Sequence, residues 1–184
     1  MYRINDVIAS SVKLGPSLIE GGGVGLFATA VIPDGIPVCE YKGDIFTTAE
    51  IIARKEKGIP LTYSVNFATK VCPQGSPLCC DSHPEHCKSE IGLGGFINDK
   101  MGPDLREAQD CGELSREAVV GGSREQHIKQ FYSLRQNLLK RGYNVYFWEI
   151  PQGTSFLVMS LRQIEVGEEL YTDYGNEYWT GQAS

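Results

Sequence analysis

Glycine and proline are so frequent in this chain that few segments are long enough, without either residue, to form long regular helices. The 184 residues include 21 glycines and 9 prolines. Glycine adopts backbone conformations that other residues avoid, and proline cannot continue a helix, so both favour turns. We therefore expect a mostly β fold of the α+β class, built from short strands and tight turns. A chain of this length favours one domain, spanning residues 1–184.

The runs between these turns are typical of strands. Residues 21–25 form a glycine-rich turn, and Pro33, Asp34 and Gly35 form a second turn. Strands are predicted over residues 36–46 and 61–72, and residues 72–95 are predicted to be irregular. Two further β-rich runs, 144–150 and 155–161, flank a short Pro-Gln-Gly-Thr turn, which predicts a hairpin.

Two segments carry helix signals. Thr47 and Glu50 have the spacing of a capping box, so a short helix should run from there to about Lys57, with Gly58 as its C-terminal cap. Ser123 and Gln126 form a second such pair, and an apolar stripe from Ile128 to Leu139 follows, which predicts a helix over 123–141. A further helix is expected over 104–119. Together they form a helical insertion at about 100–142, whose apolar stripe suits core packing or a homodimer face.

The formal net charge of −6 argues against a general nucleic-acid binder and suits a basic partner, such as a lysine-rich peptide. The first residues lack a basic segment followed by a long apolar stretch, so no signal peptide is visible. No run of about eighteen apolar residues occurs, so no membrane span is expected. The chain is therefore expected to be intracellular, with no direct nucleic-acid or membrane partner.

The segment from Gly23 to Ala28 formally fits the dinucleotide-binding pattern G-x-G-x-x-A, with Glu40 or Asp44 as the following acid. That pattern needs a helix that starts at the glycines and presents its N-terminus to a pyrophosphate. Pro33 and Gly35 interrupt the segment that follows, so the context excludes this interpretation. A glycine turn without a ligand remains an alternative.

A series of motifs in a fixed order is more informative than any one of them. The series consists of Gly23-Val24-Gly25-Leu26-Phe27-Ala28, Glu40-Tyr41-Lys42-Gly43, Gly95-Phe96-Ile97-Asn98, and Gly167-Glu168-Glu169-Leu170 running into Asp173-Tyr174-Gly175. The series resembles the SET-domain protein lysine methyltransferases from about Gly21 to Trp179. The resemblance implies a SET-like fold of small β-sheets, with a C-terminal pseudoknot that brings Asn98 and Tyr174 together.

The resemblance also implies a site and an activity. The cofactor would be S-adenosylmethionine, the substrate a protein lysine, and a histone tail the leading substrate class, which would place the protein in the nucleus. Tyr174 matches the catalytic tyrosine, and Tyr63 resembles a tyrosine that lines the lysine channel. Trp179 would either cover the adenine or pack on the core. The implied cofactor-binding residues are Gly22, Gly23, Val24, Gly25, Leu26, Asn98, Asp99, Tyr174 and Trp179.

Tyrosines suit this chemistry. A free lysine has a pKa of about 10.4, so neutralising its amine at pH 7 costs roughly 4–5 kcal/mol. An apolar, tyrosine-lined tunnel disfavours the ammonium and lowers that cost. Alignment of the amine, methyl group and sulfur contributes several kcal/mol more. No metal is needed.

The sequence departs from the family pattern at two positions. Asp99 follows the asparagine where family members usually have histidine, and Thr172 replaces the aromatic residue that usually precedes the Asp-Tyr pair. That aromatic position often influences how many methyl groups are added. Both changes support a second hypothesis, in which the chain is a catalytically silent SET-like domain that binds a protein.

The cysteines and histidines between residues 72 and 87 support a third hypothesis, a zinc-stabilised interaction domain. In this segment no paired Cys-x-x-Cys occurs, and the cysteine-rich tail of some family members is absent. The expectation is therefore no metal, with Cys39 and Cys111 as ordinary buried thiols. The residues considered are Cys72, Cys79, Cys80, His83, His86 and Cys87.

Overall fold

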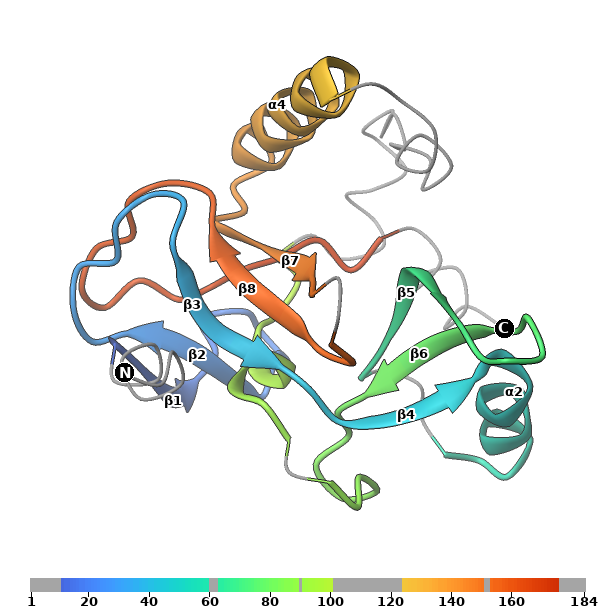
Figure 1. Ribbon diagram of the computed structural model, residues 1–184. Coiled ribbons are helices and arrows are strands. Elements are labelled where there is room, and N and C mark those ends of the chain that lie inside the picture. Colours follow the sequence, from blue (N-terminus) through green and yellow to red (C-terminus); the bar gives the residue numbers. More distant parts are fainter. Residues whose placement is uncertain (1–10, 60–62, 90, 101–123, 151–152, 176–184) are drawn as a thin grey trace, which may run out of the picture.

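The computed structural model describes residues 11–59, 63–89, 91–100, 124–150 and 153–175. Within these residues, small antiparallel β-units make up most of the regular structure, and helices are few (Figure 1). The predicted mostly β class is confirmed. No helix among the described residues is both long enough and apolar enough to span a membrane.

The N-terminal unit is a hairpin and the central unit is a three-stranded sheet. Strand β1 (Val12–Pro16) pairs with β2 (Val24–Ala28) across the glycine-rich turn. The central sheet has the order β3-β8-β7, with β3 at Pro37–Tyr41, β8 at Phe156–Ser160 and β7 at Val145–Glu149. Strands β7 and β8 pair in antiparallel register, which confirms the predicted hairpin.

The second three-stranded sheet corrects two sequence-based predictions. It has the order β4-β6-β5, with β4 at Asp44–Thr47, β6 at Pro77–Asp81 and β5 at Ser64–Val71. The single strand predicted over 36–46 is wrong, because the chain leaves the central sheet after Tyr41 and enters this one at Asp44. A Cβ on Gly43 would lie 2.0 Å from the Asp81 carbonyl oxygen, so the crossing requires glycine.

The prediction of an irregular segment over 72–95 is wrong for β6. This strand is central in its sheet, with β4 on one side and β5 on the other. One partner, β4, lies far away in the sequence, whereas β5 is joined to β6 by the short turn that contains Gly75. The turn signal therefore marks a hairpin, and pairing with the distant β4 makes β6 the central strand.

The helices begin where the capping signals place them. Helix α2 spans Thr48–Glu56, and the predicted capping box is present: the Glu50 N–H donates to Thr47 Oγ1 at 3.3 Å, and the Thr47 N–H donates to Glu50 Oε2 at 2.8 Å. Helix α4 spans Arg124–Lys140, close to the predicted 123–141. The helix predicted over 104–119 and Ser123 lie outside the described residues. A 3-10 helix, η2, spans Leu93–Phe96.

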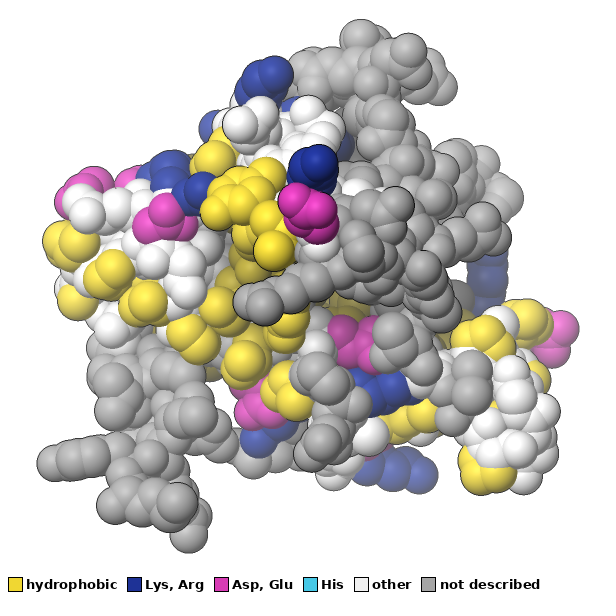
Figure 2. Space-filling view, turned by 45° about the horizontal axis from the view of Figure 1, so that its top comes forward, with side chains coloured by type: hydrophobic (Ala, Val, Ile, Leu, Met, Phe, Trp, Pro, Cys, Tyr) yellow, Lys and Arg dark blue, Asp and Glu magenta, His cyan; other side chains and the backbone are white. Residues whose placement is uncertain are grey.

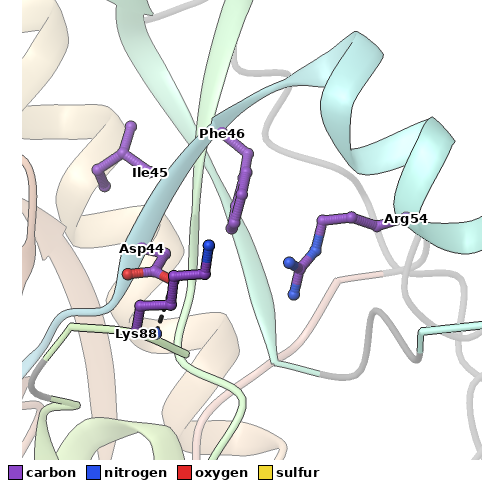
Figure 3. Close-up of a pocket in the computed structure, with 5 residues that line it drawn as sticks. All are labelled: Asp44, Ile45, Phe46, Arg54 and Lys88. Carbon is purple, nitrogen blue, oxygen red and sulfur yellow. Dashed lines mark hydrogen bonds between the residues drawn. The ribbon is translucent and has the colours of Figure 1, made fainter. Parts of the chain in front are cut away.

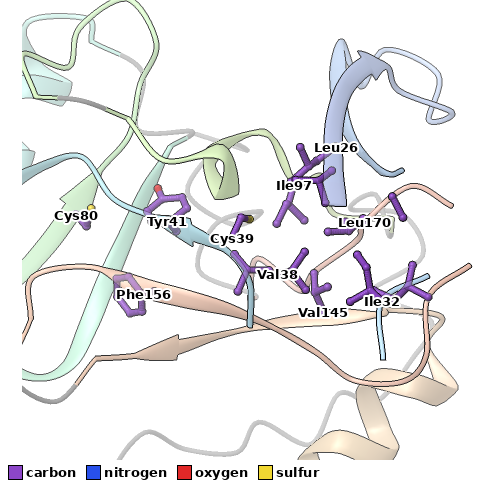
Figure 4. Packing of buried hydrophobic residues seen from close by; sticks show 14 of the residues in the cluster. Leu26, Ile32, Val38, Cys39, Tyr41, Cys80, Ile97, Val145, Phe156 and Leu170 are labelled. Atoms are coloured by element: carbon purple, nitrogen blue, oxygen red, sulfur yellow. The ribbon is translucent and has the colours of Figure 1, made fainter. Parts of the chain in front are cut away.

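One hydrophobic core joins the N-terminal hairpin, the central sheet and the C-terminal segment (Figure 4). Leu26 of β2, Ile97 and Leu170 are almost fully buried in it. Cys39 is buried as predicted, and desolvation raises its pKa well above the ordinary range. Cys111 lies outside the described residues. This core places the glycine turn, the asparagine motif and the C-terminal segment next to one another.

Candidate functional site

The C-terminal segment runs directly beside the Asn-containing motif. Asn98 and Tyr171 form a parallel β-bridge, and the Thr172 N–H donates to the Asn98 carbonyl oxygen at 3.0 Å. Residues 97–99 and 169–174, which we call the knot, are therefore bound together backbone to backbone. The predicted juxtaposition of Asn98 and Tyr174 is confirmed.

Tyr174 is held at both its hydroxyl and its backbone. The hydroxyl donates to the Ile97 carbonyl oxygen at 2.6 Å, and the N–H donates to Asp99 Oδ2 at 3.0 Å. The ring is thereby fixed across residues 97–99. A phenol oriented in this way keeps its oxygen lone pairs available to a reacting group nearby.

Asp99 has a structural task in the knot. Its side chain is buried, and besides the Tyr174 N–H it accepts a hydrogen bond of 2.7 Å from the Tyr143 hydroxyl. Burial, followed by the bond to Asp99, raises the pKa of Tyr143, so that hydroxyl stays a donor. The Asp99 carboxylate thus faces the protein interior, so the predicted cofactor contact of this residue would involve its backbone. Thr172 is also buried, where the family pattern has an aromatic residue.

Asn98 connects the knot to the glycine turn. Its Nδ2 donates to the Val24 carbonyl oxygen at 3.1 Å and to Glu169 Oε1 at 3.2 Å. The predicted cofactor residues of the turn therefore lie next to the predicted asparagine. The Leu26 side chain is an exception, because it is fully buried in the core, and its carbonyl oxygen accepts from the Leu170 N–H at 2.8 Å.

The turn and its surroundings fit a small polar ligand such as S-adenosylmethionine. Gly21 and Gly23 have φ angles of 75° and 63°, and a Cβ on either would meet open space. Glycine in such a turn lets a ligand approach the backbone closely. Val24 is 48% exposed beside it. Asn98 presents one further group, its side-chain oxygen, for which no hydrogen-bond partner is found among the described residues.

Tyr41 is a site residue that the sequence reasoning missed. It is buried, and its hydroxyl donates to the Tyr63 carbonyl oxygen. Burial raises the pKa of Tyr41 well above its ordinary value, with a smaller contribution from the neighbouring Tyr174. Tyr41 thus connects the backbone of Tyr63 to the hydrophobic core. The available signal was the position of Tyr41 inside the Glu40-Tyr41-Lys42-Gly43 motif.

Glu169 is a second residue that the sequence reasoning did not assign. It is 2% exposed and lies under the glycine turn, where a Cβ on Gly25 would come within 2.2 Å of its Oε1. Its motif, Gly167-Glu168-Glu169-Leu170, marked the family but gave no reason to separate the two acids. In the structure they differ, because Glu168 pairs with Arg162 at 2.6 Å and Glu169 faces the site.

The cysteine–histidine segment does not form a metal centre. Among the described residues, which include all six candidates, no group of three His, Cys, Asp or Glu side chains is arranged to hold a metal ion. Cys79 and Cys80 are buried in β6, where desolvation raises the pKa of each to about 12. The His83 ring packs against His86 at 4.4 Å and against Tyr63 at 5.0 Å. The geometry therefore does not support a zinc-stabilised domain. Trp179 lies outside the described residues.

A surface hollow of about 280 Å³ between β4 and α2 is separate from this site (Figure 3). The Arg54 guanidinium points into it, but that group pairs with Asp81 at 2.7 Å and lies over the Phe46 ring at 4.3 Å. Asp44, on the opposite side, accepts hydrogen bonds from the Lys88 and Ser89 N–H groups. These groups are used in holding the sheet and the 83–89 segment together.

Comparison with known proteins agrees with this geometry. The methyltransferase domain of human PR domain-containing protein 2 superposes with a TM-score of 0.54 at 16% identity, covering 95% of this chain and 83% of that one. CpSET8 from Cryptosporidium superposes with a TM-score of 0.53 at 21% identity, covering 93% of this chain and 60% of that one. No curated protein matches the chain in sequence. The family model of the SET domain matches residues 23–175, and the chain therefore belongs to the SET-domain family, whose members are generally protein lysine methyltransferases.

Proposed function

We propose that this protein transfers a methyl group from S-adenosylmethionine to a lysine of a protein substrate. The observation that carries the proposal is the knot, in which Tyr174 is fixed by Ile97 and Asp99 beside Asn98 and the open glycine turn. The predicted cofactor turn and the predicted catalytic tyrosine thus belong to one hydrogen-bonded unit.

The chain's own residues would prepare the lysine amine. S-adenosylmethionine, when bound, supplies a methyl group activated by the sulfonium charge. In the proposed site, Tyr63 and Tyr174 would line a lysine channel in which an ammonium is poorly solvated, which lowers the pKa of an entering lysine. Because burial keeps the Tyr41 hydroxyl protonated, it stays neutral and adds no charge that would stabilise the ammonium.

A basic protein tail, and a histone tail in particular, is the substrate class that we propose. The net charge of −6 would attract a lysine-rich segment. A nuclear location follows if the substrate is a histone. The exposed apolar residues of α4, Ile128 and Tyr132, support the proposal that the insertion selects the partner or forms a homodimer contact.

The competing hypothesis is a silent SET-like domain that binds a protein without methylating it. Its sequence argument rests on Asp99 and Thr172. Asp99, however, accepts a hydrogen bond from the Tyr174 N–H. The aspartate in place of the usual histidine therefore helps to position the tyrosine. Thr172 remains the stronger argument for the silent domain.

Incubation with S-adenosylmethionine labelled on the methyl group, against purified core histones and a panel of other basic proteins, tests the proposal. We expect label in a protein band, lost in the Tyr174→Phe variant and stable to conditions that hydrolyse carboxyl esters. Calorimetric titration with the cofactor is run in parallel. Cofactor binding without transfer to any protein would favour the silent domain, and absence of binding would overturn both.

A further inference from the structure

The carboxylate of Glu169 is buried and ionised, and it has no cationic partner among the described residues. It accepts hydrogen bonds from Ser17 Oγ at 2.7 Å, the Leu18 N–H at 2.7 Å, the Tyr171 hydroxyl at 2.7 Å and Asn98 Nδ2 at 3.2 Å. All these donors are neutral. They fill the acceptor positions of the carboxylate, so the group is well solvated by the protein but its charge is not cancelled.

Nearby cations in the described part of the chain are engaged elsewhere. Arg162 pairs with Glu168 at 2.6 Å, and Arg141 pairs with Asp173 at 2.7 Å. The Lys100 ammonium lies 5.7 Å from the centre of the Tyr171 ring, and the hydroxyl of that tyrosine contacts Glu169. Burial opposes ionisation of Glu169, yet hydrogen bonds led by that of the Leu18 N–H outweigh it and lower the pKa. The negative charge therefore persists at neutral pH.

Buried charges in proteins are normally paired, because an isolated one is costly. The position of the Glu169 carboxylate indicates which kind of group would pair with it. Its Oε1 occupies the space that a Gly25 side chain would take, directly under the turn, and the same oxygen accepts from Asn98. A cationic ligand seated on the turn and Asn98 would complete the charge balance.

We infer that Glu169 is a specificity-determining residue, whose charge makes this site favour the sulfonium form of the cofactor over its neutral thioether product. The inference rests on the proposed function. The two ligands, S-adenosylmethionine and S-adenosylhomocysteine, share the adenosine, the ammonium and the carboxylate, and differ in the methyl group and the charge on sulfur. A fixed negative charge attracts the shared ammonium in both ligands but the sulfonium in only one, so the ratio of the two affinities reports the sulfonium, and weaker binding of the thioether promotes product release.

The test is calorimetric titration of both ligands into the wild-type chain of 184 residues and into Glu169→Gln, which keeps the shape of the side chain and removes its charge. We expect the preference for S-adenosylmethionine relative to S-adenosylhomocysteine to fall by about fivefold or more, as for a charge pair in a partly buried site. Ser17→Ala is the matched control, because it removes one hydrogen bond and keeps the charge. Its ratio of affinities should stay within about twofold of wild type.

Ser17→Lys provides a second variant if Glu169→Gln does not fold, as judged by thermal unfolding. It introduces an ammonium on a flexible side chain next to the carboxylate, which can pair with the Glu169 charge while that charge is kept. The same fall in the ratio is expected. An unchanged ratio in a folded Glu169→Gln, or failing that in Ser17→Lys, would overturn the inference while leaving the proposed function intact. A wild-type chain that binds neither ligand would instead overturn the proposed function, and this inference with it.

Discussion

The knot and helix α4 differ in how their side chains are used. In the knot, the polar side chains of Asn98, Asp99 and Tyr174 are bound to groups that lie far away in the sequence. On α4, Ile128 and Tyr132 are 45% and 56% exposed. In the space-filling view, hydrophobic side chains lie among Lys and Arg side chains over the region of α4 (Figure 2).

Among the described residues, a limited set of side chains attaches α4 to the rest of the molecule. Leu138 is buried against Tyr143 and Leu161, and Arg135 donates to the Leu161 carbonyl oxygen and to Asp34. The helix stands beside the central sheet rather than within the core (Figure 1). A substitution in the knot should therefore alter cofactor affinity or turnover. A substitution on the outer face of α4 should alter neither.

The largest effect is expected from Asn98→Ala. The substitution removes the side chain that donates to Val24 and Glu169 and leaves their oxygens without this partner. We expect cofactor affinity to fall by roughly 100-fold, or about 2.7 kcal/mol. Calorimetric titration measures it, with circular dichroism to establish that the variant folds. Wild-type affinity in a folded Asn98→Ala protein would remove this site from consideration.

Tyr174→Phe should come next. It removes only the hydroxyl that donates to Ile97, so unfolding free energy should change by less than about 1.5 kcal/mol. Turnover should fall tenfold or more, which corresponds to roughly 1.4 kcal/mol of lost transition-state stabilisation. Rates are compared per mole of folded protein on a verified substrate. Methylation at the wild-type rate would refute the assignment of this tyrosine.

Tyr63→Phe should reduce turnover less, by roughly threefold, because its backbone carbonyl and not its hydroxyl accepts from Tyr41. The ring contact with His83 is kept, so the wall of the site stays in place. Steady-state kinetics on the same substrate, measured beside Tyr174→Phe, decide the order. A loss larger than that of Tyr174→Phe would move the catalytic role to Tyr63.

The smallest effect on the site is expected from Ile128→Ser combined with Tyr132→Ser. Both side chains are exposed on α4, so cofactor affinity should stay within about twofold and stability within about 0.5 kcal/mol. Selection among protein substrates, or self-association in sedimentation, should change. Weakened cofactor binding in the folded double variant would show that the insertion belongs to the active site.

The sequence by itself determined where the turns lie, where helix α2 begins and which motifs are neighbours in the fold. Turn residues limit strand length locally, and the Thr47–Glu50 capping box sets the start of α2 through bonds within one helical turn. The order of the motifs identified Asn98 and Tyr174 as neighbours, because the resemblance carries a known topology. Those features depend on nearby residues or on a pattern shared with a family.

Tertiary structure alone decided the features that depend on distant contacts. Gly43 is required because the Asp81 carbonyl lies against it, and β6 is central in its sheet because the distant strand β4 pairs with it on the side opposite β5. Tyr41 and Glu169 became site residues through burial beside segments far away in the chain. Burial and long-range pairing are properties of the folded arrangement, so the motifs that contain Tyr41 and Glu169 marked these residues in the sequence but could not reveal their contacts.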